Sequence, residues 1–324
     1  KILYKMPIYV YSFIYSVLFM LFTVPIAIKV GFKFDILDKV EFEDKSDNNK
    51  EKREKLHTKT TPRTGGIAVF LSFWLSIILT IGFSMEILGI FLGSLFLFSV
   101  MLYDDKFDLS PKIKFIAQII AASIPIFFGV KINFLSAIFS KQYYAIGIWG
   151  IPLTILWSVA LVNALNWIDG LDGLASGIAA IASLGIVMIS LNRGLIIAAT
   201  LGLSLAGVCL IFLRYNFYPA KIFLGDCGAQ FLGYIVSMIA ILGGLKTSTS
   251  VIIIVSAIAL GVPIFDVIFS IFTRIRKGKP IYKADLENIH YQLHRKGWGQ
   301  RKIAFLFYVV TLFLCIIPYF IFAR

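Results

Sequence analysis

The chain has 324 residues, of which 59% are hydrophobic and 15% are charged, and its formal net charge is +13. A soluble domain contains about 45–50% apolar and about 25% charged residues, so this composition excludes a soluble globular protein and a disordered chain. The three cysteines, Cys209, Cys227 and Cys315, stand in apolar stretches without paired or metal-ligand spacing, which excludes a disulfide scaffold.

Ten apolar stretches of the chain are long enough, or nearly so, to cross a membrane, since a spanning helix needs about 20 mostly apolar residues. The sequence therefore predicts an all-α polytopic membrane protein in which residues 1–324 form a single integral-membrane domain. The first stretch is too long for a signal peptide and lacks a small-residue cleavage site. In chain order, the predicted spans are 8–29, 65–83, 86–103, 113–130, 148–166, 175–191, 194–213, 222–243, 250–272 and 303–322.

Basic residues predict the orientation of these spans. One alternating set of connections carries 24 of the 31 lysines and arginines, and cytoplasmic loops are enriched in these residues. We therefore expect this set to face the cytoplasm, and we attribute the net charge to this bias and to an anionic substrate rather than to nucleic acid. The set comprises 29–63, 104–114, 167–174, 214–221 and 273–302.

Two of these connections have distinct predicted roles. Residues 41–60 are highly charged and lack apolar periodicity, so we expect a mobile cytoplasmic loop there. Residues 273–302 are rich in arginine and lysine, and we expect a cytoplasmic substrate-binding loop.

Acidic residues stand at the predicted cytoplasmic ends of several spans, where an ionisable group beside hydrocarbon is a functional candidate. Asp104, Asp105 and Asp108 follow the third span, and Lys114 comes soon after. Adjacent carboxylates repel one another, and a divalent cation or basic neighbours would relieve that repulsion. The alternative interpretation is a solvated loop at the end of a helix.

A second acidic group lies in the stretch NALNWIDGLDGLASG, residues 163–177. Asp169 and Asp172 are three residues apart, a spacing that puts both on one face of a helix. Asn163 and Asn166 add polar oxygens, and the glycines allow a ligand to approach the backbone closely. This combination between two apolar spans is hard to explain by packing alone.

Three further candidates come later in the chain. Asp226 opens the eighth span between two glycines, where it is either a functional acid or a simple helix cap. Arg274 and Arg276 suit phosphate recognition, although ordinary positive-inside charge is the alternative. Asp266 lies within the ninth span and either pairs with a neighbour such as Arg274 or lines the site.

Acids from separate loops on one side of the membrane, together with bases suited to phosphate, indicate a Mg²⁺-dependent phosphate reaction at the cytoplasmic surface. The sequence contains no G-x-S-x-G, no P-loop and no H-E-x-x-H motif, so the common nucleophile and metalloprotease mechanisms are not indicated.

Five stretches match a known family in its own order. They are HTKTTPRTGGIA (57–68), YDDKFDLSPKIK (103–114), NALNWIDGLDGLASG (163–177), FLGDCGAQFLG (223–233) and DLENIHYQL (285–293). On these motifs the chain resembles the polyprenyl-phosphate N-acetylhexosamine-1-phosphate transferases, glycosyltransferase family 4. It is most similar to the WecA/TagO-like branch, to which the phospho-MurNAc-pentapeptide translocase is related.

The resemblance implies a bacterial plasma-membrane enzyme with ten or eleven helices and a cytoplasmic active site. It would transfer N-acetylhexosamine 1-phosphate, with N-acetylglucosamine the expected sugar, from a UDP-sugar to undecaprenyl phosphate and release UMP. This would be the first membrane step of a cell-envelope glycan such as teichoic acid or O-antigen. Mg²⁺ is the implied cofactor, with Mn²⁺ as a substitute.

The resemblance also implies roles for individual residues, carried over motif by motif. The catalytic candidates are Asp104, Asp105 and Asp169, and the metal candidates are Asp172 and Asp226. The substrate-binding candidates are Lys114, Asn163, Asn166, Arg274, Arg276 and His290. A lower-ranked group contains His57, Arg63, Asp108 and Asp266.

One departure from the family pattern leaves alternatives open. The stretch Asn288-Ile289-His290-Tyr291 has one histidine where the branch usually has three, which puts the sugar specificity in doubt. The phospho-MurNAc-pentapeptide translocase is therefore one alternative, and an ion-coupled transporter, which also uses intramembrane acids, is another. Besides the two substrates, the expected partners are membrane lipid and a second copy of the chain, with no nucleic acid.

Overall fold

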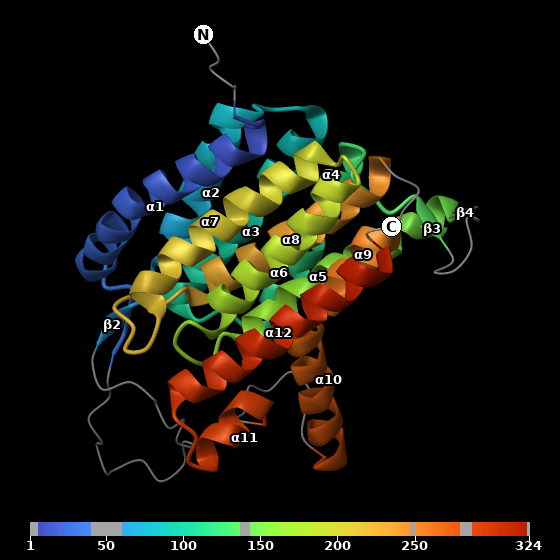
Figure 1. The fold of residues 1–324 in the computed structure, drawn as a ribbon. Coiled ribbons are helices and arrows are strands. Elements are labelled where there is room, and N and C mark those ends of the chain that lie inside the picture. Colours follow the sequence, from blue (N-terminus) through green and yellow to red (C-terminus); the bar gives the residue numbers. More distant parts are fainter. Residues whose placement is uncertain (1–5, 40–59, 137–142, 247–249, 279–286, 323–324) are drawn as a thin grey trace.

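A computed structural model describes residues 6–39, 60–136, 143–246, 250–278 and 287–322, and helices dominate this part of the chain (Figure 1). Within these ranges the α-helices are α1 (Ile8–Lys33), α2 (Gly65–Thr80), α3 (Met85–Phe107), α4 (Pro111–Phe127), α5 (Gly150–Ile168), α6 (Leu174–Asn192), α7 (Ile196–Asn216), α8 (Gly225–Lys246), α9 (Ser250–Ala259), α10 (Gly261–Arg276), α11 (Ile289–Arg295) and α12 (Gln300–Phe322). A 3₁₀ turn, Gly147–Trp149, precedes α5.

The β-strands of the described residues form two short antiparallel pairs. β1 (Leu37–Asp38) pairs with β2 (Thr61–Pro62), and β3 (Phe134–Ser136) pairs with β4 (Tyr143–Ala145). The first hairpin brings the chain back to the start of α2, whereas the second projects from the side of the helical body (Figure 1).

The all-α membrane architecture predicted from the sequence is confirmed, but the count of ten spans is too high. Seven described helices are long and apolar enough to cross a membrane, or eight if α9 and α10 form one broken span. Helix α2 has 16 residues and α4 has 17, so each is about 25 Å long. That length falls short of the roughly 30 Å hydrocarbon layer.

The predicted span 250–272 is also corrected, because it is two helices bent by 69° at a short break. Gly261 opens α10 and Pro263 stands two residues later; proline lacks the N–H that would continue a helix from α9. Helix α10 leaves the body of the molecule at its lower end (Figure 1). Phe265, Ile268 and Phe272 are exposed on it, while Asp266 is fully buried.

Helix α8 lies at the centre of the body, where it packs against α2, α3, α5, α6, α7 and α9. Its apolar window is 94% buried, whereas that of α1 is only 22% buried. This enclosure fixes the position of the first turn of α8, which carries Asp226.

The turn between α3 and α4 is short for local reasons. Asp108 ends α3 in the left-handed conformation, with φ of 49°, and Pro111 begins α4, a position at which proline fits a helix well. The last turn of α3, with Asp104 and Asp105, therefore lies beside the first turn of α4, with Lys114.

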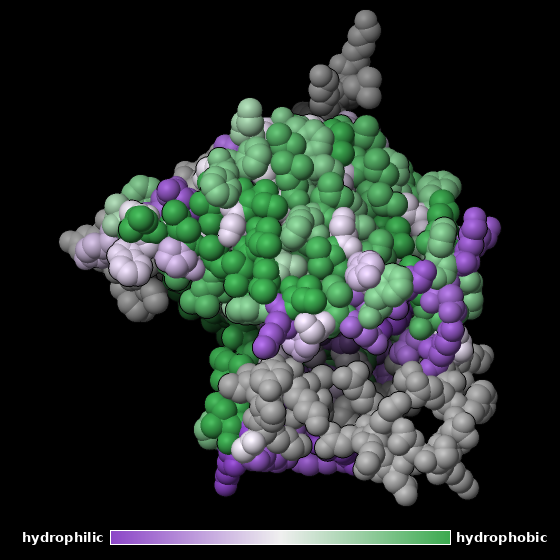
Figure 2. Space-filling model, turned by 180° about the vertical axis from the view of Figure 1, so that it is seen from behind, coloured by the Kyte–Doolittle hydropathy of each residue, from purple (hydrophilic) through white to green (hydrophobic). Residues whose placement is uncertain are grey.

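The surface of the molecule separates by polarity. Hydrophobic residues cover most of the upper body in Figure 2, and hydrophilic residues gather at its lower edge. In Figure 1, β2 and α10 lie at this lower end. The start of α8 adjoins β2, because the Phe223 N–H donates to the Pro62 carbonyl, and the end of α3 and the start of α4 contact the start of α8.

Candidate functional site

The first turn of α8 is held by a side chain from another helix. Asp105, on the last turn of α3, accepts hydrogen bonds from the backbone N–H groups of Asp226 at 2.8 Å and Cys227 at 3.1 Å. The first N–H groups of a helix have no partner within it, so a carboxylate placed there satisfies them and favours the positive end of the helix dipole. Asp105 therefore joins α3 to the start of α8, and its side chain is fully buried.

A glycine makes this contact fit. Gly225 precedes Asp226 with φ of 73°, and a Cβ built on it would lie 2.7 Å from the Asp105 carboxylate. A side chain at residue 225 would therefore be strained by its backbone conformation and would push the capping carboxylate away.

Lys114 bridges two of the predicted acids. Its Nζ lies 2.6 Å from Asp104 Oδ2 and 2.8 Å from Asp226 Oδ2. Asp104 also accepts a 2.7 Å hydrogen bond from the backbone N–H of Leu109, which holds it at the α3–α4 turn. The Lys114 and Asp226 side chains are 25% and 21% exposed, so the pair lies at the edge of the protein interior, within reach of a ligand.

Arg63 supplies a second cation to the same acids. Its Nη2 lies 3.6 Å from Asp105 Oδ1 and 3.7 Å from Asp226 Oδ1. The segment that carries Arg63 runs beside residue 223, whose N–H donates to the Pro62 carbonyl at 2.8 Å. Burial opposes the charge of Arg63, but the carboxylates of Asp105 and Asp226 outweigh it and raise its pKa.

Asp169 and Asp172 lie in the loop between α5 and α6, but their surroundings differ. Asp172 is buried and accepts a 2.9 Å hydrogen bond from the Ala220 N–H, which ties this loop to the one before α8. The backbone N–H of Asp169 donates to the Asn166 carbonyl at 3.3 Å, but its carboxylate makes no hydrogen bond or ion pair with any residue that the structure describes. Burial, reinforced by the negative charge of Asp226, raises the pKa of Asp169 to about 8, so a cation near its carboxylate would be strongly favoured.

Asp266 holds the short helix α11 in place. Its carboxylate accepts hydrogen bonds from Asn288 Nδ2 at 2.7 Å and from the Ile289 N–H at 2.6 Å. His290 Nδ1 lies 3.4 Å from the same carboxylate. Asp266 therefore positions α11 from within α10.

His290 in turn packs on the loop that carries Asp169. Its ring is fully buried, and its Nε2 lies against Gly170, where a Cβ would collide with it. The guanidinium of Arg274 lies 4.6 Å from the ring centre of Trp167, a cation–π arrangement at the end of α5. The structure thus brings α10 and α11 to the acidic loop.

The remaining predicted residues take no part in the ion pairs described above or lie outside the described part of the chain. Asn163 faces α4, where its Nδ2 donates to Gln118 Oε1 at 2.7 Å. Asp108 and Arg276 are exposed, and Asn166 is half-buried. His57 and nearly all of the predicted loop 41–60 lie outside the described residues.

Two buried glutamines were missed by the sequence analysis. Gln118 stands four residues after Lys114, and Gln230 stands four residues after Asp226. Each is a polar residue one helical turn from a predicted site residue inside an otherwise apolar span, and that spacing was the signal that could have identified them.

The donor set of this cluster fits a magnesium ion bound through few protein ligands. Among the described residues, no group of three or more His, Cys, Asp or Glu side chains is arranged to hold a metal. Mg²⁺, however, usually takes only one or two carboxylates and completes its shell with water and substrate phosphates. Asp226, partly exposed, and Asp169, whose carboxylate has no ion-pair partner within the described ranges, are carboxylates of the kind such a site needs.

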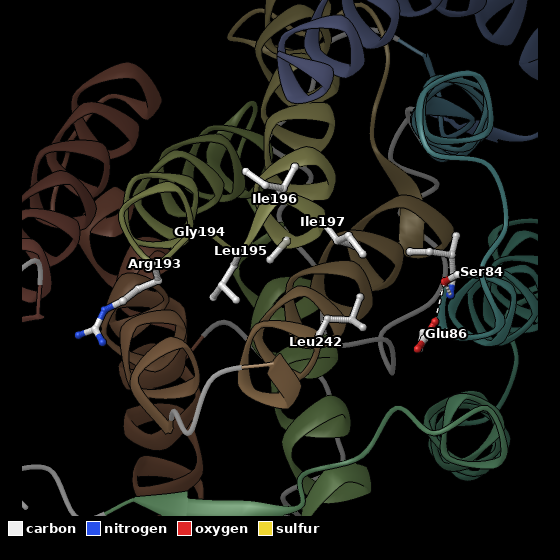
Figure 3. A pocket seen from close by; sticks show the side chains of 10 residues that line it. Ser84, Glu86, Arg193, Gly194, Leu195, Ile196, Ile197 and Leu242 are labelled. Atoms are coloured by element: carbon white, nitrogen blue, oxygen red, sulfur yellow. Dashed lines mark hydrogen bonds between the residues drawn. The ribbon is translucent and has the colours of Figure 1, made fainter. Parts of the chain in front are cut away.

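A cavity of about 280 Å³ lies at the opposite end of the same helices (Figure 3). Ser84, Glu86 and Ile87 line it from the start of α3, and Leu242 lines it from the last turns of α8. Because Asp105 and Asp226 occupy the other ends of these two helices, this cavity is separate from the acid–base cluster.

The fold and the cluster together define a multi-pass membrane protein with a partly buried acid–base site at one end of its helices. Comparison with known proteins gives a more specific result. The sequence model of glycosyl transferase family 4 matches residues 87–244, and the chain belongs to this family.

Relatives of this chain extend the similarity over most of its length. It is 35% identical over 302 residues to a probable undecaprenyl-phosphate N-acetylglucosaminyl 1-phosphate transferase of Bacillus subtilis, covering 93% of this chain and 81% of that protein. It is 30% identical over 292 residues to a decaprenyl-phosphate N-acetylglucosaminephosphotransferase of Mycobacterium tuberculosis, covering 78% and 70%. A phospho-N-acetylmuramoyl-pentapeptide-transferase of Clostridium botulinum is 36% identical over 181 residues, covering 56% and 54%.

The family expected from the sequence is therefore confirmed, and the protein is a membrane transferase. The alternative of an ion-coupled transporter gains no support from these comparisons. Pentapeptide transferases are relatives as well, and one from Prochlorococcus marinus is 30% identical over 95% of this chain. The N-acetylglucosaminyl enzyme of Bacillus subtilis has a higher identity, 35%, over a similar share of the chain, 93%.

Proposed function

We propose that this protein transfers N-acetylglucosamine 1-phosphate from UDP-N-acetylglucosamine to undecaprenyl phosphate, at the cytoplasmic face of a bacterial plasma membrane. The observation that carries this proposal is the pair of cations, Lys114 and Arg63, held on Asp226 at the polar end of the helices. The Bacillus subtilis relative, a probable undecaprenyl-phosphate N-acetylglucosaminyl 1-phosphate transferase, supports the sugar and the lipid acceptor, and the Mycobacterium tuberculosis relative supports the same sugar.

The reaction brings two anions together, so positive charge at the meeting point is its main requirement. An oxygen of the lipid phosphate attacks the phosphorus that bears the sugar, and a new P–O bond forms. The bond from that phosphorus to the bridging oxygen breaks, and UMP leaves with the electron pair. A phosphate monoester has its second pKa near 6 and is largely dianionic at neutral pH, so a general base would contribute little.

The cations are placed where they could meet phosphate oxygens. Lys114 and Arg63 approach Asp226 from different elements, and neither side chain is fully buried. Asp104 and Asp105 act here as positioning residues: the first fixes Lys114, and the second caps α8 and contacts Arg63. This differs from the catalytic role that the resemblance implies for them.

Magnesium is part of the proposal, with Mn²⁺ as a substitute. Asp226 and Asp169 would hold the ion; Asp172, the other metal candidate from the sequence, is engaged with the Ala220 N–H through one oxygen. When bound, Mg²⁺ would neutralise diphosphate charge and assist departure of UMP. Asp266 and His290 would keep α11 against the Asp169 loop, and Arg274 and Arg276 would face the donor from α10.

The site also suits the physical state of the two substrates. The acid–base cluster lies at the polar end of a body whose surface, on the face seen in Figure 2, is largely hydrophobic. The prenyl chain can therefore remain in hydrocarbon while its phosphate reaches the cluster, and the nucleotide can approach from water.

The test is UMP release by the purified protein in detergent micelles with undecaprenyl phosphate and a panel of UDP-sugars. We expect release only when the lipid phosphate is present, with UDP-N-acetylglucosamine the best donor. Preference for UDP-MurNAc-pentapeptide would assign the chain to the pentapeptide transferase reaction instead. If no UDP-sugar in the panel gives UMP release that depends on the lipid phosphate, the proposal is overturned.

A further inference from the structure

Helices α4 and α8 are linked by polar side chains across the interior of the molecule. Both helices pack against α3 and against α5, and both begin at the acid–base cluster. The first link is the 2.8 Å ion pair between Lys114 and Asp226. The second lies one turn deeper, where Gln118 Nε2 donates to Gln230 Oε1 at 3.0 Å and both residues are buried.

A third link follows at the next turn. Tyr234 is fully buried, and its hydroxyl donates to the Ala121 carbonyl at 3.3 Å. On α8 the three linking residues are spaced by four, and on α4 they are spaced by four and three. This is the spacing of one face of a helix, so the same faces of α4 and α8 are joined for three successive turns.

The direction of the amide hydrogen bonds is set by a backbone carbonyl. Asn163 Nδ2 donates to the Val159 carbonyl at 2.8 Å and also to Gln118 Oε1 at 2.7 Å. A carbonyl can only accept, so the amide orientation of Asn163 is fixed, and that of Gln118 follows from it. Gln118 must then present Nε2 to Gln230, whose oxygen accepts. The chain of donors ends at Gln230 Nε2, which is buried without a partner in the described structure.

We propose that Gln118 and Gln230 are positioning residues that hold Lys114 against Asp226 by fixing the register of α4 on α8. Tyr234 contributes the third link, and Asn163, on α5, orients the hydrogen bond between Gln118 and Gln230. The role in transfer rests on the proposed function, whereas the positioning itself does not. This interpretation differs from the direct substrate contact that the family resemblance implies for Asn163.

The physical reason lies in the surroundings of these residues. An amide removed from water has few alternative partners, so breaking its hydrogen bond leaves polar atoms unsatisfied and favours the paired register. Lys114, by contrast, has a long, flexible stem at a partly exposed site. Its position therefore depends on how firmly the backbone of α4 is held one turn below.

Lys112 provides an internal reference for measuring this. It stands two residues before Lys114 on the same helix and is exposed. In the full-length protein in detergent, a brief pulse of an amine-acylating reagent followed by mass spectrometry gives the ratio of Lys114 to Lys112 modification. An ion-paired amine reacts more slowly, so the wild-type ratio is expected to be well below one.

The diagnostic variant is Gln230→Met, which keeps length and removes the acceptor. We expect it to raise the ratio of Lys114 to Lys112 modification about fivefold. Loss of one hydrogen bond would increase the population in which Lys114 is released from Asp226 by about this factor. Gln230→Glu keeps an acceptor oxygen for Gln118 and should restore a ratio near that of the wild type. Tyr234→Phe removes a link further from Lys114 and should give a smaller rise, which serves as a second reading if Gln230→Met does not fold.

Ser237→Ala is the matched control. Ser237 lies on α8 and makes a buried 3.2 Å hydrogen bond with Ser158 on α5, but it is not part of the links to α4. Its removal should leave the ratio unchanged. An unchanged ratio in both Gln230→Met and Tyr234→Phe, or an equal rise in Ser237→Ala, would overturn the proposal.

Activity separates this inference from the proposed function. Gln230→Met should lower kcat for UMP release, and it should have no further effect when combined with Lys114→Met, because both changes act on the same contact. A multiplicative loss in the double variant would indicate general destabilisation and contradict the positioning role. If the wild type releases no UMP, the proposed function fails, and the modification ratio still decides whether the glutamines hold Lys114.

Discussion

Helices α3 and α8 each carry an acid in the first turn, Glu86 and Asp226, but their starts lie at opposite ends of the molecule and are capped differently. At the start of α3, Ser84 accepts the Ile87 N–H at 3.3 Å and donates to Glu86 at 2.6 Å (Figure 3). At the start of α8, the cap is the carboxylate of Asp105, which accepts a hydrogen bond from the Asp226 N–H. These two residues are 121 positions apart in the chain.

The difference shows how one structural device serves two purposes. A cap from the adjacent residues completes a single helix and contributes about 1 kcal/mol to its stability. A cap from another helix also joins two elements, so it determines where Asp226 lies relative to Lys114 and Arg63. Changes at the two helix starts should therefore affect different properties of the protein.

Removal of divalent cations should have the largest effect. The protein with excess EDTA should show no UMP release, because the charge of the two phosphates would be left uncompensated. Addition of Mg²⁺ or Mn²⁺ above the chelator concentration should restore the rate. Transfer that persists in excess chelator would remove the metal from the proposed mechanism.

Asp226→Asn should lower kcat about 10³-fold, since it removes the anion that both cations and the proposed metal share. The measurement is the rate of UMP release, together with its dependence on Mg²⁺ concentration. Glu86→Gln is the matched control, because it neutralises an acid at the corresponding place on α3, and it should retain wild-type activity. Near-normal transfer by Asp226→Asn would contradict the assignment of this site.

Asp105→Ala should reduce both activity and stability. It leaves the N–H groups of Asp226 and Cys227 buried without their acceptor, at about 1–3 kcal/mol, and it frees Arg63 from one of its two partners. We expect UMP release to fall about 10²-fold and the detergent-solubilised protein to unfold at a lower temperature. Loss of stability with full activity would mean that the position of Asp226 does not depend on this cap.

Ser84→Ala should have the smallest effect. It removes a local cap from an exposed helix start, so we expect a loss of about 1 kcal/mol of stability and unchanged kcat and KM. Thermal unfolding and UMP release measure the two quantities. A fall in activity here would show that the two helix starts are coupled through the length of the molecule.

Much of the candidate site could be predicted because charges are conspicuous in an apolar sequence. Asp104, Asp105, Lys114 and Asp226 were selected as charged residues at the ends of spans, and the structure brings all four into one cluster. The all-α class followed from composition for the same reason, since only helices satisfy the backbone of this many apolar segments in lipid.

What could not be predicted depends on contacts between distant segments. Arg63 was ranked low, because nothing in its own stretch shows that residue 62 pairs with residue 223. Asp266 was read as a partner of Arg274 or a lining residue, whereas the N–H groups it accepts belong to α11, beyond a loop. The break after Ala259 was missed because a hydropathy pattern records how apolar a segment is and not whether it is straight.

The enclosure of α8 has a consequence for how its sequence can change. Insertion of a single residue after Asp226 would rotate everything beyond it by about 100° and turn Gln230 and Tyr234 away from α4, although no existing side chain would have been altered. The same insertion in α1, most of whose surface is open, would chiefly exchange one lipid-facing side chain for another. Tolerance to insertions and deletions along the chain should therefore follow burial, with α8 the strictest segment and α1 among the most permissive.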